Sequence, residues 1–157
     1  MAWSPVDNSA PARGTRGNDV TIRLMTSEAS VRDAIAEHVD HVVTREQRSR
    51  TSVWFIVCDR SPTDYVVHLP VDELPPSATD EECRFIAGFF ADTVAQLRVQ
   101  TGMAVVLTRP GGPTVAEVDR RWYRAVHGSC LAHAVRLLGV HLLTPGGSRE
   151  LFFDDIV

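Results

Sequence analysis

The sequence predicts a single α/β domain over residues 20–157, in which three helices flank a mixed sheet of about five strands. Two long apolar repeats have helical spacing and follow capping sequences. Two pairs of short apolar runs are each separated by turn residues, which is typical of hairpins. A further run, GMAVVLT, has the length and composition of a strand that is buried on both faces.

The N-terminal part of this domain predicts a helix followed by a hairpin. The segment TSEASVRDAIAEHVDHVV carries apolar residues at helical spacing, and Thr26 or Ser27 is its expected cap. The runs SVWFIVC and YVVHLPV have strand composition and are separated by the turn residues DRSPTD. Pro70 lies at the end of the second run, where a missing backbone donor is tolerated. We therefore expect an antiparallel hairpin here.

The strongest helical signal covers roughly residues 80–100. Thr79 and Glu82 form a capping box at its start. The large apolar residues that follow repeat at helical spacing and are Phe85, Ile86, Phe89, Phe90, Val94 and Leu97. We expect this whole face to pack on the sheet.

The C-terminal part predicts a buried strand, a second long helix and a terminal hairpin. GMAVVLT is the strand, and Thr114 with Glu117 forms the capping box of the helix. The apolar stripe of this helix continues to Leu138, and Gly139 is its expected C-terminal cap. The runs VHLLT and ELFF, separated by the turn PGGS, complete the sheet.

Composition and charge narrow the class of protein. The chain has 157 residues, and 44% of them are hydrophobic. Its net charge of −4 argues against a broad phosphate-binding surface, so nucleic acid is not an expected partner. All 16 basic residues are arginines, a usage typical of a GC-rich bacterial genome. Residues 1–19 predict a disordered tail, and neither a membrane span nor a secretory signal is visible. We expect a cytoplasmic protein in which Cys58, Cys83 and Cys130 are free, buried thiols.

The junction VVLTRPGGPTVAEVDRRW joins the buried strand to the second long helix. Taken with the order of elements, it resembles the metal-site loop of the JAB/MPN metallopeptidase fold, as in RadC-type proteins, which has a layering like that of the cytidine deaminases. In that family the strand ends in His-x-His-Pro, and a Gly/Pro turn precedes Thr/Ser-x-Ser-x-x-Asp. Pro110, Gly112, Pro113, Thr114 and Asp119 match this pattern when one loop residue is deleted. The resemblance covers about residues 27–154 and implies the same fold.

The chain departs from that pattern at the metal ligands. The two family histidines, which hold zinc together with the aspartate, fall on Leu107 and Arg109, and the family serine falls on Ala116. Leucine has no donor atom, arginine is a permanent cation, and Asp119 alone cannot hold zinc. The resemblance therefore implies a relative with no metal and no other cofactor. We expect Arg109 to pair with Asp119 in place of the ion.

Two histidine clusters are weaker candidates for chemistry. His38 and His41 share a helical face in EHVDH, which would suit a metal pair, but the sequence offers no third ligand and ordinary surface histidines are the expected alternative. His127, Cys130 and His133 follow one another at helical spacing, as a nucleophilic thiol and its base would. Cys130, however, falls within the apolar stripe, which predicts an inert thiol.

The start of the second long helix is the remaining candidate for binding. DRRWYR places several arginines beside aromatic residues, and the preceding Gly-Gly turn exposes backbone donors to an anion. Acidic residues in the same turn favour a solvated surface as the alternative. The candidate binding residues are Arg109, Gly111, Gly112, Thr114, Asp119, Arg120 and Arg124.

The function expected from the resemblance is that of a non-catalytic interaction or scaffolding module, which binds a protein partner or a second copy of the chain. The alternative is a metal-independent enzyme or a RadC-like, nucleic-acid-associated protein that uses the region of Arg109, Asp119 and Arg124.

Overall fold

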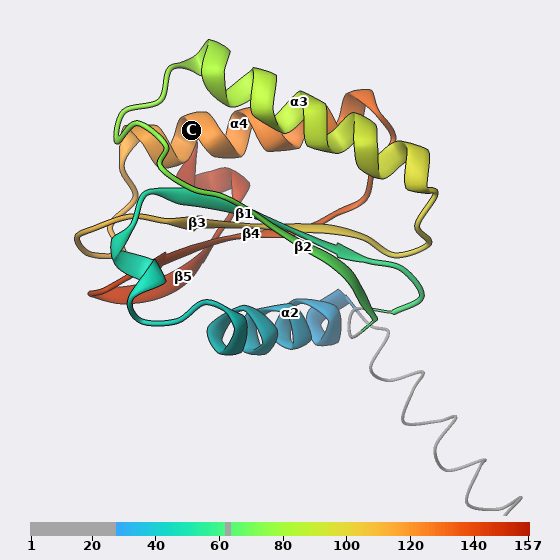
Figure 1. The fold of residues 1–157 in the computed structure, drawn as a ribbon, viewed down its shortest axis with the longest axis horizontal. Helices are drawn as coiled ribbons and strands as arrows, with labels where there is room; N and C mark the ends of the chain where they lie inside the picture. The colour runs from blue at the N-terminus through green and yellow to red at the C-terminus, as the bar shows by residue number, and fades with distance from the viewer. Residues whose placement is uncertain (1–27, 62–63) are drawn as a thin grey trace, which may run out of the picture.

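The computed structural model describes residues 28–61 and 64–157, so the tail predicted for residues 1–19 lies outside the described residues. It contains a five-stranded mixed sheet with one long helix on one face and two long helices on the other (Figure 1). The predicted α/β class, with about five strands and three helices, is confirmed. No helix in these two ranges is long and apolar enough to cross a membrane.

The sheet has the strand order β2-β1-β3-β4-β5. Its strands are β1 Ser52–Cys58, β2 Tyr65–Val71, β3 Gly102–Thr108, β4 Leu137–Thr144 and β5 Gly147–Leu151. β1 pairs antiparallel with both β2 and β3, β3 and β4 are parallel, and β4 and β5 form the terminal hairpin. The first predicted hairpin is therefore confirmed, and Pro70 lies in the edge strand β2, where it is tolerated.

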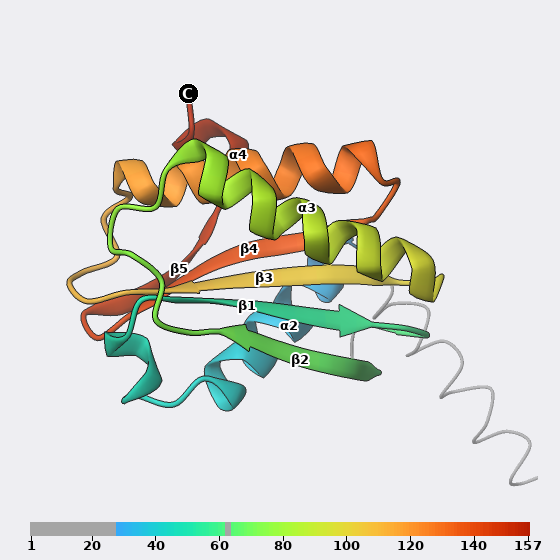
Figure 2. The ribbon, with the colours of Figure 1, turned by 45° about the horizontal axis from the view of Figure 1, so that its top comes forward.

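Alternate residues of the central strands belong to two separate hydrophobic cores, one on each face of the sheet. Val53 and Phe55 of β1 belong to the core beneath α3 (Asp80–Leu97) and α4 (Glu117–Ala132). Trp54 and Ile56 belong to the core beneath α2 (Glu28–Val42). Figure 2 shows α3 and α4 side by side over the sheet, and the two helices pack on each other. β3 is buried along its whole length because helices cover both of its faces, as its uninterrupted apolar sequence predicts.

The face that α3 turns to the sheet differs from the predicted one. Thr79 caps the helix as expected, because its hydroxyl accepts a hydrogen bond from the backbone N–H of Glu82 at 3.2 Å. Phe85, Phe89 and Leu97, however, are 75%, 62% and 53% exposed. The fully buried residues of the helix are Cys83, Ala87, Ala91 and Val94. Small side chains on this face let α3 pack closely on α4, while Phe90 reaches the sheet and stacks on Phe55. Part of the large apolar stripe therefore points outward.

Both ends of α4 also differ from the prediction. Its N-cap is Ala116, and no side-chain cap is formed by Thr114. The helix stops at Ala132, and Ala134 then takes a left-handed φ of 54°, which reverses the chain into β4. Leu138, predicted in the helix, therefore lies in a strand, and Gly139 is a strand residue rather than a helix cap.

The last strand begins and ends earlier in the chain than the predicted run ELFF. β5 ends at Leu151, and the chain then forms a 3-10 helix over Phe153–Asp155. The carboxylate of Asp155 accepts the backbone N–H of Phe152 at 2.8 Å and a guanidinium N–H of Arg149 at 2.7 Å. These contacts accompany the end of the strand before both phenylalanines, and Phe152 and Phe153 are exposed.

Candidate functional site

Arg109 is the first residue after β3, and its guanidinium organises the loop that leads to α4. Nε donates to Asp119 Oδ1 at 3.0 Å and Nη2 donates to Asp119 Oδ2 at 2.8 Å, which is a bidentate pair. The remaining donors reach the backbone carbonyls of Pro110, Gly112 and Thr114 at 3.1, 3.2 and 2.8 Å. All five N–H donors of the guanidinium are thus used within the loop.

Asp119 lies in the first turn of α4, where a carboxylate suits the positive end of the helix dipole. Its side chain is 2% exposed, against 16% for that of Arg109. It also accepts the backbone N–H of Ala116 at 2.8 Å, which supplies the missing helix cap. The hydrogen bond to Asp119 raises the pKa of Arg109. The ion pair predicted from the sequence is therefore present, and it also caps the helix.

The two loop glycines have structural positions of their own. Gly111 has a φ of 99°, which favours glycine, and its carbonyl accepts the backbone N–H of Gly146 at 3.1 Å. Gly146 belongs to the turn between β4 and β5, so the Arg109 loop is tied to that turn. The carbonyls of Gly112 and Thr114 face Arg109, as described above. A binding role for the loop stays a prediction.

The side chains around this loop do not suit a divalent cation. Leu107 and Arg109 lie two residues apart at the end of one strand and so share a face. Leu107 is buried in the core, and the carboxylate of Asp119 is already neutralised by a fixed guanidinium. Among residues 28–61 and 64–157, no group of three or more His, Cys, Asp and Glu side chains is arranged to hold a metal ion. The loop therefore offers no ligand set to zinc.

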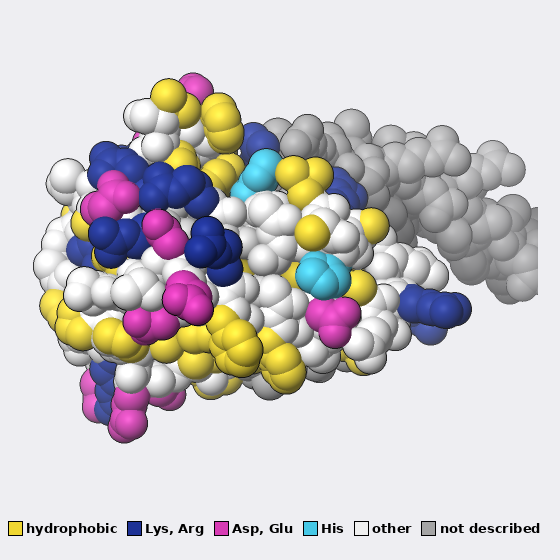
Figure 3. Space-filling model, turned by 90° about the horizontal axis from the view of Figure 1, so that it is seen from above, with side chains coloured by type: hydrophobic (Ala, Val, Ile, Leu, Met, Phe, Trp, Pro, Cys, Tyr) yellow, Lys and Arg dark blue, Asp and Glu magenta, His cyan; other side chains and the backbone are white. Residues whose placement is uncertain are grey.

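The arginines of α4 are paired with neighbouring groups. Arg120 donates to the backbone carbonyl of Asp155 at 3.1 Å, and Arg121 donates to that of Ala78 at 3.2 Å. Arg124 lies 3.0 Å from Glu117, and this hydrogen bond is the main reason that the pKa of Glu117 is lowered. Figure 3 shows acidic side chains interspersed with the basic ones on this surface. The arrangement is that of a mixed, solvated surface and not of a continuous basic patch.

His127, Cys130 and His133, from the segment HGSCLAH, are not arranged as a reactive thiol and its base. Cys130 is buried, and burial raises the pKa of its thiol to about 11, so the thiolate is scarce at neutral pH. His127 stacks on Tyr123 with ring centroids 5.9 Å apart, while Nε2 of His133 lies 3.8 Å from Asp92. The inert thiol predicted from the apolar stripe is thus what the structure contains. His41, from the other candidate cluster, is exposed on α2.

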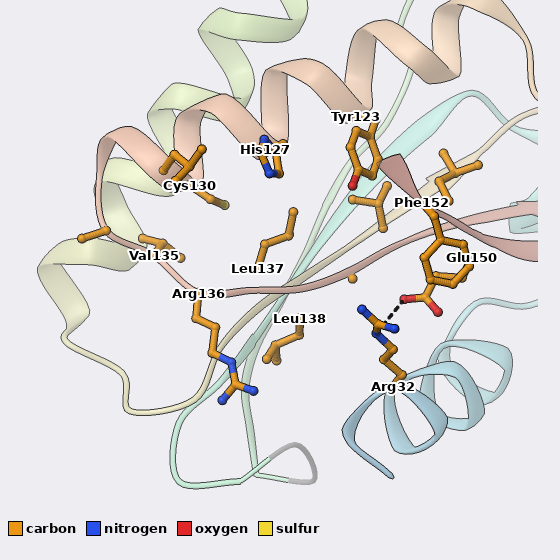
Figure 4. A pocket seen from close by; sticks show the side chains of 15 residues that line it. Arg32, Tyr123, His127, Cys130, Val135, Arg136, Leu137, Leu138, Glu150 and Phe152 are labelled. Carbon is orange, nitrogen blue, oxygen red and sulfur yellow. Dashed lines mark ion pairs between the residues drawn. The ribbon is translucent and has the colours of Figure 1, made fainter. Parts of the chain in front are cut away.

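Sequence reasoning missed a cavity of about 520 Å³ at the opposite end of β4 from the Arg109 turn. It lies between α4, the start of β4 and the N-terminal part of α2 (Figure 4). His127 and Cys130 line it from α4, and Arg32 and Glu150 line it from the other side. The residues come from four separate segments, so only the fold brings them together.

The comparisons with known proteins identify no relative. No family model, no curated protein and no solved structure matches the chain.

Proposed function

We propose that this chain is a non-catalytic relative of the JAB/MPN metallopeptidases that serves as a protein-interaction module. The observation that carries the proposal is the Arg109–Asp119 ion pair. At the place where the resemblance requires two imidazoles and a carboxylate, the chain has a buried leucine and a salt bridge. A metal-bound water needs an open coordination position held by three protein ligands, and these residues supply neither.

The order of elements supports the same proposal. A helix, a hairpin, a helix, a strand, a helix and a final hairpin follow one another along the chain. The resemblance implies the same order as far as the strand that follows the last helix. The loop in question runs from the end of a strand buried on both faces to the first turn of α4. This is the position in which the family carries its metal-site loop.

The surface of α3 supports an interaction role over catalysis. Phe85 and Phe89 lie one helical turn apart and are both largely exposed. Figure 3 shows hydrophobic side chains gathered along one edge of the face formed by α3 and α4. Exposed apolar surface of this kind is typical of protein–protein contacts. The partner in this proposal is another protein or a second copy of the chain.

The alternative is a metal-independent enzyme or a nucleic-acid-associated protein that works through the Arg109 region. The described side chains favour this alternative less, because Arg109, Arg120 and Arg124 all contact groups within the chain.

We place the protein in the cytoplasm. A reducing compartment suits Cys58, Cys83 and Cys130, which are buried and form no disulfide within the described part of the chain.

Zinc retention tests the proposal. Wild type and the double variant Leu107→His/Arg109→His are dialysed against zinc and then against metal-free buffer, and the zinc left per chain is measured by mass spectrometry. The double variant supplies both imidazoles and releases Asp119, so we expect it to retain zinc stoichiometrically while wild type retains almost none. Arg109→His alone is the matched control and should retain none, because it still lacks one ligand.

Two results would contradict the proposal. Stoichiometric zinc in wild type would show that the loop is a metal site after all. A double variant that has the circular dichroism of wild type and still fails to retain zinc would show that Leu107 and Arg109 do not stand at the ligand positions.

A further inference from the structure

We propose that the cavity beside the start of β4 binds an extended, acidic peptide segment of a partner protein by adding a strand to the sheet. This inference rests on the proposed interaction function and gives it a site and a class of partner. The cavity lies beside the start of β4, at the end of the strand opposite the Arg109 loop. Its floor is a stretch of β4 that pairs with a strand on one side only.

The pairing of β4 defines that open edge. Residues 137–139 pair with β3, through Met103 opposite Leu137 and Ala104 opposite Gly139. Pairing with β5 begins only at Val140, opposite Leu151. Beyond Leu151 the chain leaves the sheet, so within residues 28–61 and 64–157 no strand pairs with the outer backbone edge of residues 137–139. An unpaired edge is a template for an added strand, and this one lies inside a cavity rather than on a flat surface.

Gly139 leaves this part of the strand edge without a side chain. It has a φ of 156°, and a β-carbon there would lie 2.9 Å from Glu150 Oε1 and 3.1 Å from His141 Nε2. The first distance is too short for a real β-carbon contact and the second is tight, and the positive φ is one that other residues rarely adopt. Glycine at this position therefore leaves room for the carboxylate of Glu150 beside the backbone.

The walls of the cavity suit alternate side chains of an extended peptide. Figure 4 shows Leu137 pointing toward α4, where His127 and Tyr123 face the cavity, while Leu138 and Arg136 point to the opposite side of the strand. Leu131, on the α4 side, is 71% exposed. A bound strand would thus place one set of side chains against an apolar and aromatic wall, and the other set beside arginine.

The charge at the cavity favours a peptide that carries carboxylates. Arg32 is held near Glu150, with 3.9 Å between Nε and Oε1, and its guanidinium lies over the ring of Phe152. Arg136 is exposed and forms no ion pair with any residue in the described part of the chain. The cavity therefore has two guanidinium groups and one carboxylate on its lining. The uncompensated guanidinium of Arg136 complements an acidic side chain of the partner.

The experiment starts from a random peptide library displayed on phage and selected against the wild-type chain. Selected peptides are synthesised, and their dissociation constants are measured by fluorescence anisotropy. Arg136→Glu and Leu131→Asp should each weaken binding by roughly tenfold or more. The matched controls are Arg60→Glu, in the β1–β2 turn, and Leu97→Asp, on α3, which change the same residue types outside the cavity and should leave binding unchanged.

N-methylation of the peptide backbone separates strand addition from other modes of binding. Methyl groups on the amides that face β4 remove donors, whereas those on alternate amides do not, so binding should be lost with a period of two residues. If every N-methylated peptide binds as well as the parent, strand addition is wrong.

The remaining outcomes separate this site from the proposed function. Binding that survives Arg136→Glu and Leu131→Asp, but is lost in Phe85→Asp, would overturn the cavity site and leave the interaction function in place on α3. Failure to select any binding peptide would also overturn the cavity site. The zinc measurement tests the proposed function independently of both.

Discussion

At the scale of single residues, one ion pair organises the loop from β3 to α4. The pairing of Arg109 with Asp119 was predicted from the resemblance, which places both residues at metal-ligand positions of the loop. The sequence was not sufficient to predict the three carbonyl acceptors of Arg109. Those contacts depend on the conformation of the loop backbone, which residue types alone do not specify.

Loss of the Asp119 carboxylate should destabilise the protein strongly. Asp119→Ala leaves the partly buried Arg109 without its partner and removes the cap of α4, so we expect the free energy of unfolding to fall by about 3 kcal/mol or more. The matched control is Glu117→Ala, which breaks the exposed pair with Arg124 and should lower the free energy of unfolding far less. Urea unfolding followed by tryptophan fluorescence measures both. Equal losses in the two variants would contradict a structural role for the pair.

His141 is the second residue whose environment has a measurable consequence. It lies on β4, is 3% exposed, and its Nε2 has no hydrogen-bond partner among the residues that the structure describes. Burial lowers its pKa to about 4, although the charge of Asp40 opposes the shift. The folded protein therefore holds this imidazole neutral at pH values where the unfolded chain would already bind a proton.

The stability of the fold should consequently fall in acid. The unfolded chain takes up a proton at His141 below about pH 6.5. The folded chain does so only near the lowered pKa, so stability present above pH 6.5 is lost as the pH falls toward 4. The difference corresponds to about 3 kcal/mol. Unfolding free energies of wild type and His141→Leu, measured at pH 7 and pH 4.5, should show a smaller acid loss in the variant. Identical losses would show that His141 does not titrate in this way.

At the scale of elements, periodicity located the helices better than it oriented them. The apolar residues of α3 cover more of its circumference than one contact face, and the sequence ranks phenylalanine as more readily buried than alanine. The structure instead buries Ala87 and Ala91, since close packing of α3 against α4 favours small side chains. The end of α4 was misplaced for a related reason. The apolar residues of β4 continue the helical spacing beyond Ala132, where the chain has already turned.

Substitutions in α3 should distinguish the observed face from the predicted one. Phe90 stacks on Phe55 with ring centroids 4.1 Å apart, so Phe90→Ala should lower the free energy of unfolding by about 3 kcal/mol. Phe89→Ala, the adjacent and exposed control, should change it by no more than about 0.5 kcal/mol. Thermal or urea unfolding measures both effects. A loss for Phe89→Ala as large as that for Phe90→Ala would show that the whole face expected from the sequence is buried.

At the scale of the whole molecule, the class of fold could be predicted but the cavity could not. The continuous apolar run of β3 predicts a sheet that is covered on both faces. The cavity depends on where β5 stops pairing with β4 and on the direction in which the chain turns after Leu151. Both are properties of the assembled sheet, since residues from Arg32 to Phe152 meet there.

The most direct test of the central claim is the free energy of unfolding of the wild-type chain, measured in EDTA and again with excess zinc. A ligand that binds only the folded state raises this free energy in proportion to the logarithm of its concentration. Because the Arg109–Asp119 pair holds the loop without a metal, we predict the same value in both conditions. A markedly lower value in EDTA, restored by zinc, would contradict the account.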